Sequence, residues 1–244
     1  MKKLMFLSLA LGLVFTACKK NRDEEPVHKN LLIKRTDSDG LVFTYTYDAA
    51  NRMSGYAMTS NPYNSARNYT FTYNANGSLA EYVEANSSLK GKLTYNPDGT
   101  LASKKEYSVS GAVETLVNTY TYTYVGGMVN ENYVYAPTGN GFRDECKYDA
   151  NGNITEQKSY TTTVANPAGT YSVTVTYGNY DNKNNASESY PAAFLFPISI
   201  RNNRGSLAYS TGGFDTYAYE YNADGYPTKR TMGTEISVFE YRRL

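Results

Sequence analysis

The clearest pattern along the chain is a run in which aromatic residues alternate with threonine. It is plainest at residues 43–47, which read Phe-Thr-Tyr-Thr-Tyr, and it recurs at residues 69–73 and 120–124. A strict two-residue period, rich in aromatic and β-branched residues, predicts a β-strand whose two faces differ. One face of each strand is expected to be aromatic, and the other to carry threonine hydroxyls.

Most of these runs end in a tyrosine that is followed by a short polar turn. The turn reads Asn-x-Asn-Gly or Asn-x-Asp-Gly in its most regular copies. We expect its glycines, Gly77, Gly99, Gly152 and Gly225, to take the positive φ that a tight hairpin with a bulge requires. Each copy of the unit is therefore predicted to be a β-hairpin.

The hairpin unit repeats along nearly the whole chain. Its landmark tyrosines are residues 47, 73, 95, 124, 148, 177, 221 and 241. Most intervals between them fit two strands and two turns, which predicts an all-β antiparallel meander of about fourteen to sixteen strands. Because an open sheet of that size leaves two unpaired edges, we expect it to close or curl into a barrel.

The longest interval between landmark tyrosines, 44 residues ending at Tyr221, breaks the pattern. Residues 190–197 within it form an apolar cluster bracketed by prolines, which cannot continue a central strand. We therefore expect an irregular insertion at about residues 179–213, which either covers one open end of the barrel or faces a ligand. For the second case the candidate ligand-facing residues are Tyr190, Phe194, Leu195 and Phe196.

The first eighteen residues have the layout of a lipoprotein export signal. Two lysines precede a 12-residue apolar stretch, which is too short to span a bilayer, and a small residue and a cysteine follow. Ala17-Cys18 resembles the lipobox of bacterial lipoproteins, in which the cysteine is acylated before cleavage. The alternative is an ordinary cleaved signal. The sequence predicts a signal peptide over residues 1–17 and lipidation at Cys18.

The residues after Cys18 are polar and include an acidic trio at residues 23–25. This composition predicts a flexible tether over residues 18–28. The trio also resembles the acidic export signals of some Bacteroidetes surface lipoproteins, with a solvated linker as the alternative. Residues 29–244 are expected to form a single domain, held at the outer membrane by the lipid and either periplasmic or surface-exposed.

Charge and cysteine usage narrow the class of protein further. Removal of Lys2 and Lys3 with the signal leaves 22 basic residues against 23 acidic ones. A nucleic-acid partner is not expected, because binding to phosphates requires a basic excess. With Cys18 acylated, Cys146 is the one remaining thiol, so no intramolecular disulfide is expected and Cys146 is interpreted as a small core residue.

Catalytic motifs are sparse. The one histidine, His28, lies in the expected tether, which argues against histidine-based triads and histidine metal sites in the folded domain. The Asp and Asn residues of the turns lack the ligand spacing of a calcium loop. We expect no catalytic residue, no metal and no cofactor.

Two alternatives stay open. Paired carboxylates would suit an envelope glycan hydrolase, although pairing with lysines such as Lys105 or Lys158 is the simpler explanation for a strand carboxylate such as Glu156. A transmembrane barrel would need an apolar band facing outward, whereas Leu and Val are sparse in these strands. The carboxylates expected on strands are Glu81, Glu106, Glu114, Glu156 and Glu220.

The Tyr-Asp-x-x-Gly-x-Leu spacing of the repeats resembles the YD repeats of Rhs-type proteins. The whole mature chain resembles a Bacteroidetes lipoprotein family of unknown function with a porin-like fold, through the repeats together with residues 180–183 and 219–230. The resemblance implies a porin-like barrel and carries no assigned activity.

We therefore expect a monomeric, lipid-anchored protein of the cell envelope that acts as a non-catalytic binding or structural module. Its membrane contact would be made by the lipid anchor. Aromatic faces stack on sugars and anchor interfaces, so the tyrosine-rich surface suits a glycan, a protein or a small apolar ligand.

Overall fold

The computed structural model describes residues 30–197 and 201–244, so the predicted signal peptide, Cys18 and the tether lie outside the described residues. The described chain is almost entirely β-structure. The strands are β1 (Asn30–Asp37), β2 (Val42–Tyr47), β3 (Met53–Met58), β4 (Arg67–Tyr73), β5 (Leu79–Glu84), β6 (Leu89–Tyr95), β7 (Leu101–Ser110), β8 (Val113–Val125), β9 (Met128–Tyr135), β10 (Gly141–Tyr148), β11 (Ile154–Thr162), β12 (Thr170–Gly178), β13 (Ser206–Tyr209), β14 (Phe214–Tyr221), β15 (Pro227–Met232) and β16 (Glu235–Arg243).

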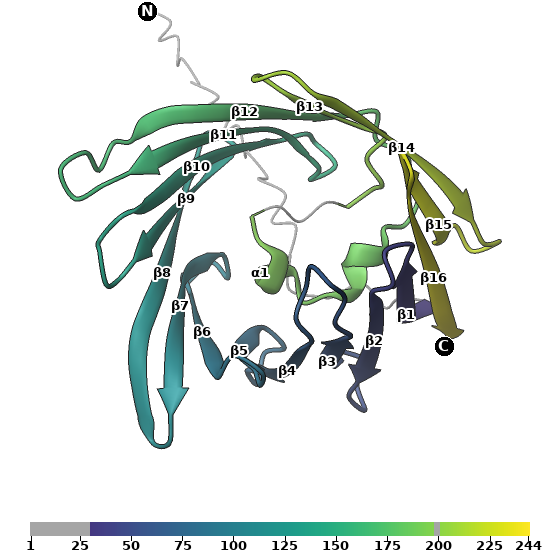
Figure 1. Ribbon diagram of the computed structural model, residues 1–244, viewed down its shortest axis with the longest axis horizontal. Helices are drawn as coiled ribbons and strands as arrows, with labels where there is room; N and C mark the ends of the chain where they lie inside the picture. Colours follow the sequence, from purple (N-terminus) through teal and green to yellow (C-terminus); the bar gives the residue numbers. More distant parts are fainter. Residues whose placement is uncertain (1–29, 198–200) are drawn as a thin grey trace, which may run out of the picture.

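The strands form a closed ring (Figure 1). Each strand pairs antiparallel with the next along the chain, and the last strand pairs with the first, from Asn30 opposite Arg243 to Asp37 opposite Ser237. Closure leaves no unpaired edge within the described sheet. The predicted antiparallel barrel of hairpins is confirmed, at the upper bound of the expected strand number.

The aromatic face of the strands points into the barrel. Phe43, Tyr45 and Phe71 are only 6–7 % exposed, whereas the intervening Thr44 and Thr46 are exposed. Burial of large aromatic side chains is a main source of stability in such a core. The two-faced strands predicted from the sequence therefore line the lumen with rings and present threonines to the outside.

Each regular hairpin turn is closed by an Asp or Asn side chain. Asp48 Oδ1 accepts the backbone N–H groups of Ala50 and Arg52, both at 2.9 Å, and the register shifts by one residue at the preceding Tyr47. This is the side-chain turn that makes Asp and Asn frequent in loops. The glycines expected at these turns have φ of 88° at Gly77, 84° at Gly99, 86° at Gly152 and 81° at Gly225.

The tyrosine before such a turn ties its strand to the preceding hairpin. Tyr73, for example, donates its hydroxyl proton to the Met53 carbonyl oxygen at 2.6 Å, at the start of β3. We call this set the tyrosine ladder. Its members are Tyr47 to Leu32 at 2.7 Å, Tyr73 to Met53 at 2.6 Å, Tyr95 to Leu79 at 2.8 Å, Tyr124 to Leu101 at 2.9 Å and Tyr241 to Pro227 at 2.9 Å.

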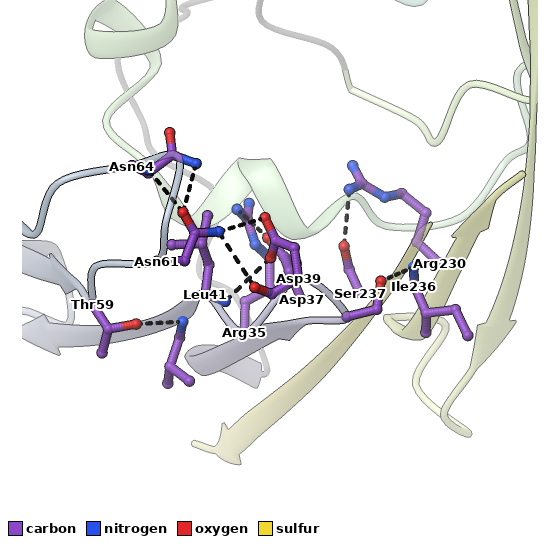
Figure 2. A network of polar contacts seen from close by, with 12 residues as sticks. Arg35, Asp37, Asp39, Leu41, Thr59, Asn61, Asn64, Arg230, Ile236 and Ser237 are labelled. Atoms are coloured by element: carbon purple, nitrogen blue, oxygen red, sulfur yellow. Dashed lines mark hydrogen bonds and ion pairs between the residues drawn. The ribbon is translucent and has the colours of Figure 1, made fainter. Parts of the chain in front are cut away.

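At the other end of the strands, polar contacts reinforce the seam between the first and last strands (Figure 2). Arg35 Nη2 pairs with Asp37 Oδ2 at 2.9 Å, and the Arg35 guanidinium lies 3.6 Å from the centroid of the Phe43 ring. On the neighbouring hairpin Arg230 donates to Ser237 Oγ at 2.9 Å. Across the seam itself, Lys34 Nζ donates to Glu240 Oε1 at 2.9 Å, and the Ile236 backbone N–H donates to Ser38 Oγ at 3.0 Å. The seam therefore has side-chain bonds in addition to its ladder.

The irregular residues 179–197 and 201–205 lie between β12 and β13 and are called the plug. It holds a 3-10 helix, η1 (Ala186–Ser189), and one helical turn, α1 (Ala192–Leu195), and α1 lies inside the ring of strands (Figure 1). The irregular region is shorter than the predicted range of 179–213, because β13 begins at Ser206. The insertion thus enters the lumen.

Candidate functional site

Asparagine side chains hold the two legs of the plug together. Asp181 Oδ1 accepts the Asn203 backbone N–H at 3.1 Å, and Asn203 Nδ2 donates to the Asn184 carbonyl oxygen at 2.8 Å. Asn185 Nδ2 likewise donates to the Asn202 carbonyl oxygen at 3.0 Å. Asn203 is 2 % exposed and Asn185 is 7 % exposed, so these bonds satisfy groups that water cannot reach.

Phe194 anchors the plug to the barrel wall. Its ring lies edge-on to the rings of Phe71 at 4.9 Å, Tyr82 at 5.0 Å, Tyr69 at 5.4 Å and Tyr56 at 6.2 Å between centroids. Edge-to-face contacts in this distance range are the preferred arrangement of aromatic pairs. The α1 turn is therefore packed firmly against β3, β4 and β5.

Two other aromatic residues of the plug, Tyr190 and Phe196, reach the wall on either side of Phe194. Tyr190 donates a hydrogen bond to the Tyr45 hydroxyl at 2.9 Å, with the rings 5.5 Å apart. Phe196 lies edge-on to Tyr122 at 5.2 Å and 6.1 Å from Tyr124. The plug thus spans the lumen side of β2 to β8.

Tyr148 departs from the tyrosine ladder. Its hydroxyl donates to the Pro197 carbonyl oxygen of the plug, whereas the ladder tyrosines reach the start of a preceding hairpin. The last residue of the plug's apolar cluster is therefore bonded to β10. The ladder is interrupted where the plug enters.

A cavity of about 280 Å³ lies between the plug and the turn end of the wall, partly open to solvent. Three tyrosines, Tyr95, Tyr124 and Tyr148, supply its ring surfaces, and Phe196 supplies one from the plug. Arg201 is the one charged residue in the lining. The remaining lining residues are Gly77, Ser78, Leu79, Gly99, Thr100, Leu101, Asn151, Gly152, Pro191, Ala192 and Ala193.

The four candidate ligand-facing residues separate into different environments. Phe196 lines the cavity, whereas Tyr190 and Phe194 are packed against the aromatic wall. Leu195 is half-buried and does not belong to the lining. Of the turn glycines, three line the cavity and Gly225 does not. The segment named from the sequence borders the cavity, but the sequence did not show which of its side chains line it.

Two acids inside the barrel were not singled out from the sequence. Glu131 on β9 and Asp144 on β10 lie opposite each other, and each is 5 % exposed. Tyr122 donates to Glu131 at 2.9 Å, and Gln157 donates to Asp144 at 2.7 Å. Burial raises the pKa of both carboxyls, that of Glu131 to about 7. The two-residue period of the strand places Glu131 on the same face as Tyr133, and this pattern could have identified it as an inward-facing residue.

Glu106 and Lys104 of β7 also face the lumen. Glu106 accepts hydrogen bonds from the Tyr82 hydroxyl and from Asn118 Nδ2, the latter at 2.7 Å. Lys104 Nζ lies 3.9 Å from the centroid of the Tyr120 ring, and burial lowers its pKa. Buried charges of this kind persist only where hydrogen bonds or rings replace water.

The other carboxylates expected on strands lie on the outer surface in ion pairs with lysines. Pairing with lysine therefore accounts for four of the five carboxylates, and Glu106 is the exception. Such exposed pairs contribute little to stability but keep the outer surface charged. The pairs are Glu81 with Lys90, Glu114 with Lys90 and Lys92, Glu156 with Lys147 and Lys158, and Glu220 with Lys229.

Cys146 is fully buried beside Ile154 and carries a free thiol, in agreement with a small core residue. Within residues 30–197 and 201–244, no group of three or more His, Cys, Asp or Glu side chains is placed to hold a metal ion. The same part of the chain has no helix that is both long and apolar enough to span a bilayer.

The fold and its repeated unit define a class: a closed antiparallel barrel of YD-type hairpins with an inward plug. The family model described as RHS Repeat matches residues 28–60. A porin-like protein from Bacteroides uniformis ATCC 8492 has a similar structure, with a TM-score of 0.54 and 15% identity over 86% of this chain and 96% of that chain. The chain therefore has a porin-like barrel fold and carries an RHS-type repeat, as the sequence resemblance implied.

Two further structures are similar at a lower level. A porin-like protein from Bacteroides vulgatus ATCC 8482 gives a TM-score of 0.47 at 12% identity, covering 88% of this chain and 100% of that chain. A structure of TcdB2-TccC3 gives a TM-score of 0.32 at 15% identity, covering 82% of this chain and 13% of that chain. No curated protein matches the sequence.

Proposed function

We propose that this protein is a non-catalytic module of the cell envelope that binds a small ligand in the cavity between plug and wall. The observation that carries the proposal is the cavity of about 280 Å³ with its mostly aromatic and aliphatic lining. Small-molecule sites are typically concave, largely apolar and pre-formed. The porin-like barrels and the RHS-type repeat support an envelope location.

The outer surface supports a barrel that stands in water and is anchored by a lipid at Cys18. Ion pairs such as Lys90 with Glu81 and Lys147 with Glu156 lie on the outward face of the strands. A lipid-facing Lys or Arg costs roughly 2–4 kcal/mol at the bilayer midplane. The threonine-rich, charged exterior is therefore unsuited to a hydrocarbon environment.

The lining of the cavity favours binding over turnover. It contains no Asp or Glu among the described residues, and the hydrolysis of a glycan requires two carboxylates across the substrate. The buried Glu106 and Glu131 are bonded to tyrosine hydroxyls. These contacts are consistent with a structural role for the lumen acids.

A cavity-filling variant tests the binding proposal. Ala192 lines the cavity and is exposed, so Ala192→Trp should occupy the space without displacing packed side chains. We expect ligand-observed NMR with a panel of single-ring compounds to show binding by the purified protein and loss of binding by the variant. The matched control is Ala112→Trp, at the exposed tip of the β7–β8 hairpin. Binding unaffected by Ala192→Trp would place the ligand elsewhere.

The anchor is tested separately. Cys18→Ser should release the protein from the membrane fraction or leave it unprocessed, because the serine hydroxyl cannot take the thioether-linked lipid. Membrane fractionation and incorporation of labelled palmitate measure this directly. Unchanged fractionation and labelling would remove the lipoprotein assignment.

A further inference from the structure

We propose that the cavity takes a ligand with one apolar ring and one anionic group, the ring between the tyrosine walls and the anion at Arg201. This inference rests on the proposed function, because it specifies the chemistry of a ligand in the same cavity. Three features carry it: the size of the cavity, the state of its hydroxyl groups, and the single charge in its lining.

The size of the cavity fits one substituted ring. An apolar cavity of about 150 Å³ accommodates benzene, and sites for drug-sized ligands begin at about 300 Å³. The cavity here measures about 280 Å³. One ring with a short substituent fills such a space, whereas a glycan of several units would have to extend out of it into solvent.

The hydroxyl groups in the wall favour an apolar ring over a sugar. Tyr95 and Tyr124 each donate their one proton to a carbonyl oxygen of the ladder, at 2.8 and 2.9 Å, and Tyr148 donates to Pro197. A sugar ring has several hydroxyls that must exchange hydrogen bonds with water for bonds with protein. These walls offer ring faces and aliphatic groups, which suit stacking.

The charge in the lining belongs to Arg201, whose backbone is held in place by a hydrogen bond. The Arg201 backbone N–H donates to Asn153 Oδ1 at 3.1 Å, and Asn153 is fully buried and held by Asp149 at 3.1 Å. The position of Arg201 is therefore set by the turn before β11, while its side chain is exposed. No ion pair of its guanidinium occurs within the described residues. Guanidinium binds carboxylate in a two-pronged geometry, which makes an acid the complementary group.

One acid of the plug, Glu188, interacts electrostatically with Arg201. Burial raises the pKa of Glu188 in the plug to about 7, against the opposing effect of the Arg201 charge. Glu188 does not belong to the cavity lining. Arg201 is therefore the charged side chain of the lining that an anionic group would meet.

The test compares 3-phenylpropionate with 3-phenylpropan-1-ol, which share the ring and chain and differ in charge. Isothermal titration calorimetry on the purified protein should show the acid binding about tenfold more tightly than the alcohol. Arg201→Gln should reduce the acid to the affinity of the alcohol, and Arg201→Lys should retain part of the preference. Arg242→Gln makes the same change in net charge at an exposed residue outside the lining and should leave both affinities unchanged.

The outcomes separate this inference from the proposed function. If both probes bind equally, or Arg201→Gln leaves the preference intact, the anionic ligand is wrong while a binding cavity stands. If glucuronate binds more tightly than 3-phenylpropionate, the apolar ring is wrong. If no probe binds and the wider ring panel also fails, the proposed function itself is wrong.

Discussion

Single hydroxyl groups hold neighbouring hairpins together at the turn end of this barrel. In the tyrosine ladder a hydroxyl satisfies a carbonyl oxygen at or near the first residue of an odd-numbered strand, next to the register shift of a turn. A phenylalanine would fill the same space but leave that oxygen without its donor. This explains why the run ends in tyrosine even where phenylalanine occurs earlier in the same strand, as at Phe71 before Tyr73.

Tyr73→Phe should therefore destabilise the protein by about 1 kcal/mol, the usual contribution of one hydrogen bond. Urea denaturation followed by circular dichroism measures the change. Tyr63→Phe is the control, since Tyr63 is 88 % exposed and should give an unchanged midpoint. Equal midpoints for both variants would mean that the ladder bond at Met53 adds no stability.

Glu131 links stability to pH. Burial raises its pKa from 4.5 to about 7, so between these values the folded state binds more protons than the unfolded state. The free energy of unfolding then falls as the pH rises through this window, by roughly 3 kcal/mol from this group once the pH exceeds 7. Below about pH 4.5 both states are protonated and this group has no effect.

Glu131→Gln should remove this contribution. Relative to the wild type, the variant should gain stability as the pH is raised from 5 to 8, because glutamine stays neutral in the same hydrogen bond with Tyr122. Thermal melts across this range give the difference. Glu220→Gln, on the exposed face in a pair with Lys229, should follow the wild-type profile. Parallel profiles for Glu131→Gln and the wild type would contradict the assignment.

Among the elements, the hairpins were predictable from the sequence and the plug was not. A two-residue period needs only local information, and residues 43–47 show it without ambiguity. The direction of the aromatic face depends on how sixteen strands close, which no single strand encodes. The prolines around residues 190–197 indicated a break in the strand pattern. Where this segment packs depends on the fit of Phe194 among four wall rings that are brought together by the fold.

The turns make a prediction of their own. Gly99 has a φ of 84°, in the left-handed region that residues with a side chain rarely adopt. Gly99→Val should destabilise the protein by about 1 kcal/mol or more, because β-branched residues rarely adopt positive φ. Ala75→Val, in the neighbouring turn at a position without positive φ, is the matched control. A melting temperature shared by the two variants would contradict the turn assignment.

For the whole molecule, the spacing of the tyrosines predicted the strands of the barrel, except within the longest interval. β13 has only four residues, Ser206–Tyr209, and lacks the aromatic alternation, so the pattern could not reveal it. The lumen acids were missed for a related reason. Glu131 and Asp144 were not singled out because the sequence does not show which face of the strands points inward, although Glu131 follows the period of Val129 and Tyr133.

A barrel with charged pairs outside and rings inside should behave as a soluble protein. We expect a chain beginning near Pro26 to be monomeric in detergent-free buffer, as measured by size-exclusion chromatography with light scattering, and inactive on a panel of envelope glycans. A need for detergent would favour a transmembrane barrel. Glycan cleavage that Glu131→Gln abolishes would favour a hydrolase.

Because the seam joins the first and last strands, the barrel cannot close until the last strand is in place. β1 and its partner β16 are the first and last strands of the described chain, with Asn30 opposite Arg243. Until β16 pairs with it, β1 has one unpaired edge that can join a strand of another molecule. Loss of β16 alone would leave fifteen strands unable to close, so truncation before Glu235 should be as harmful as truncation near the middle of the barrel.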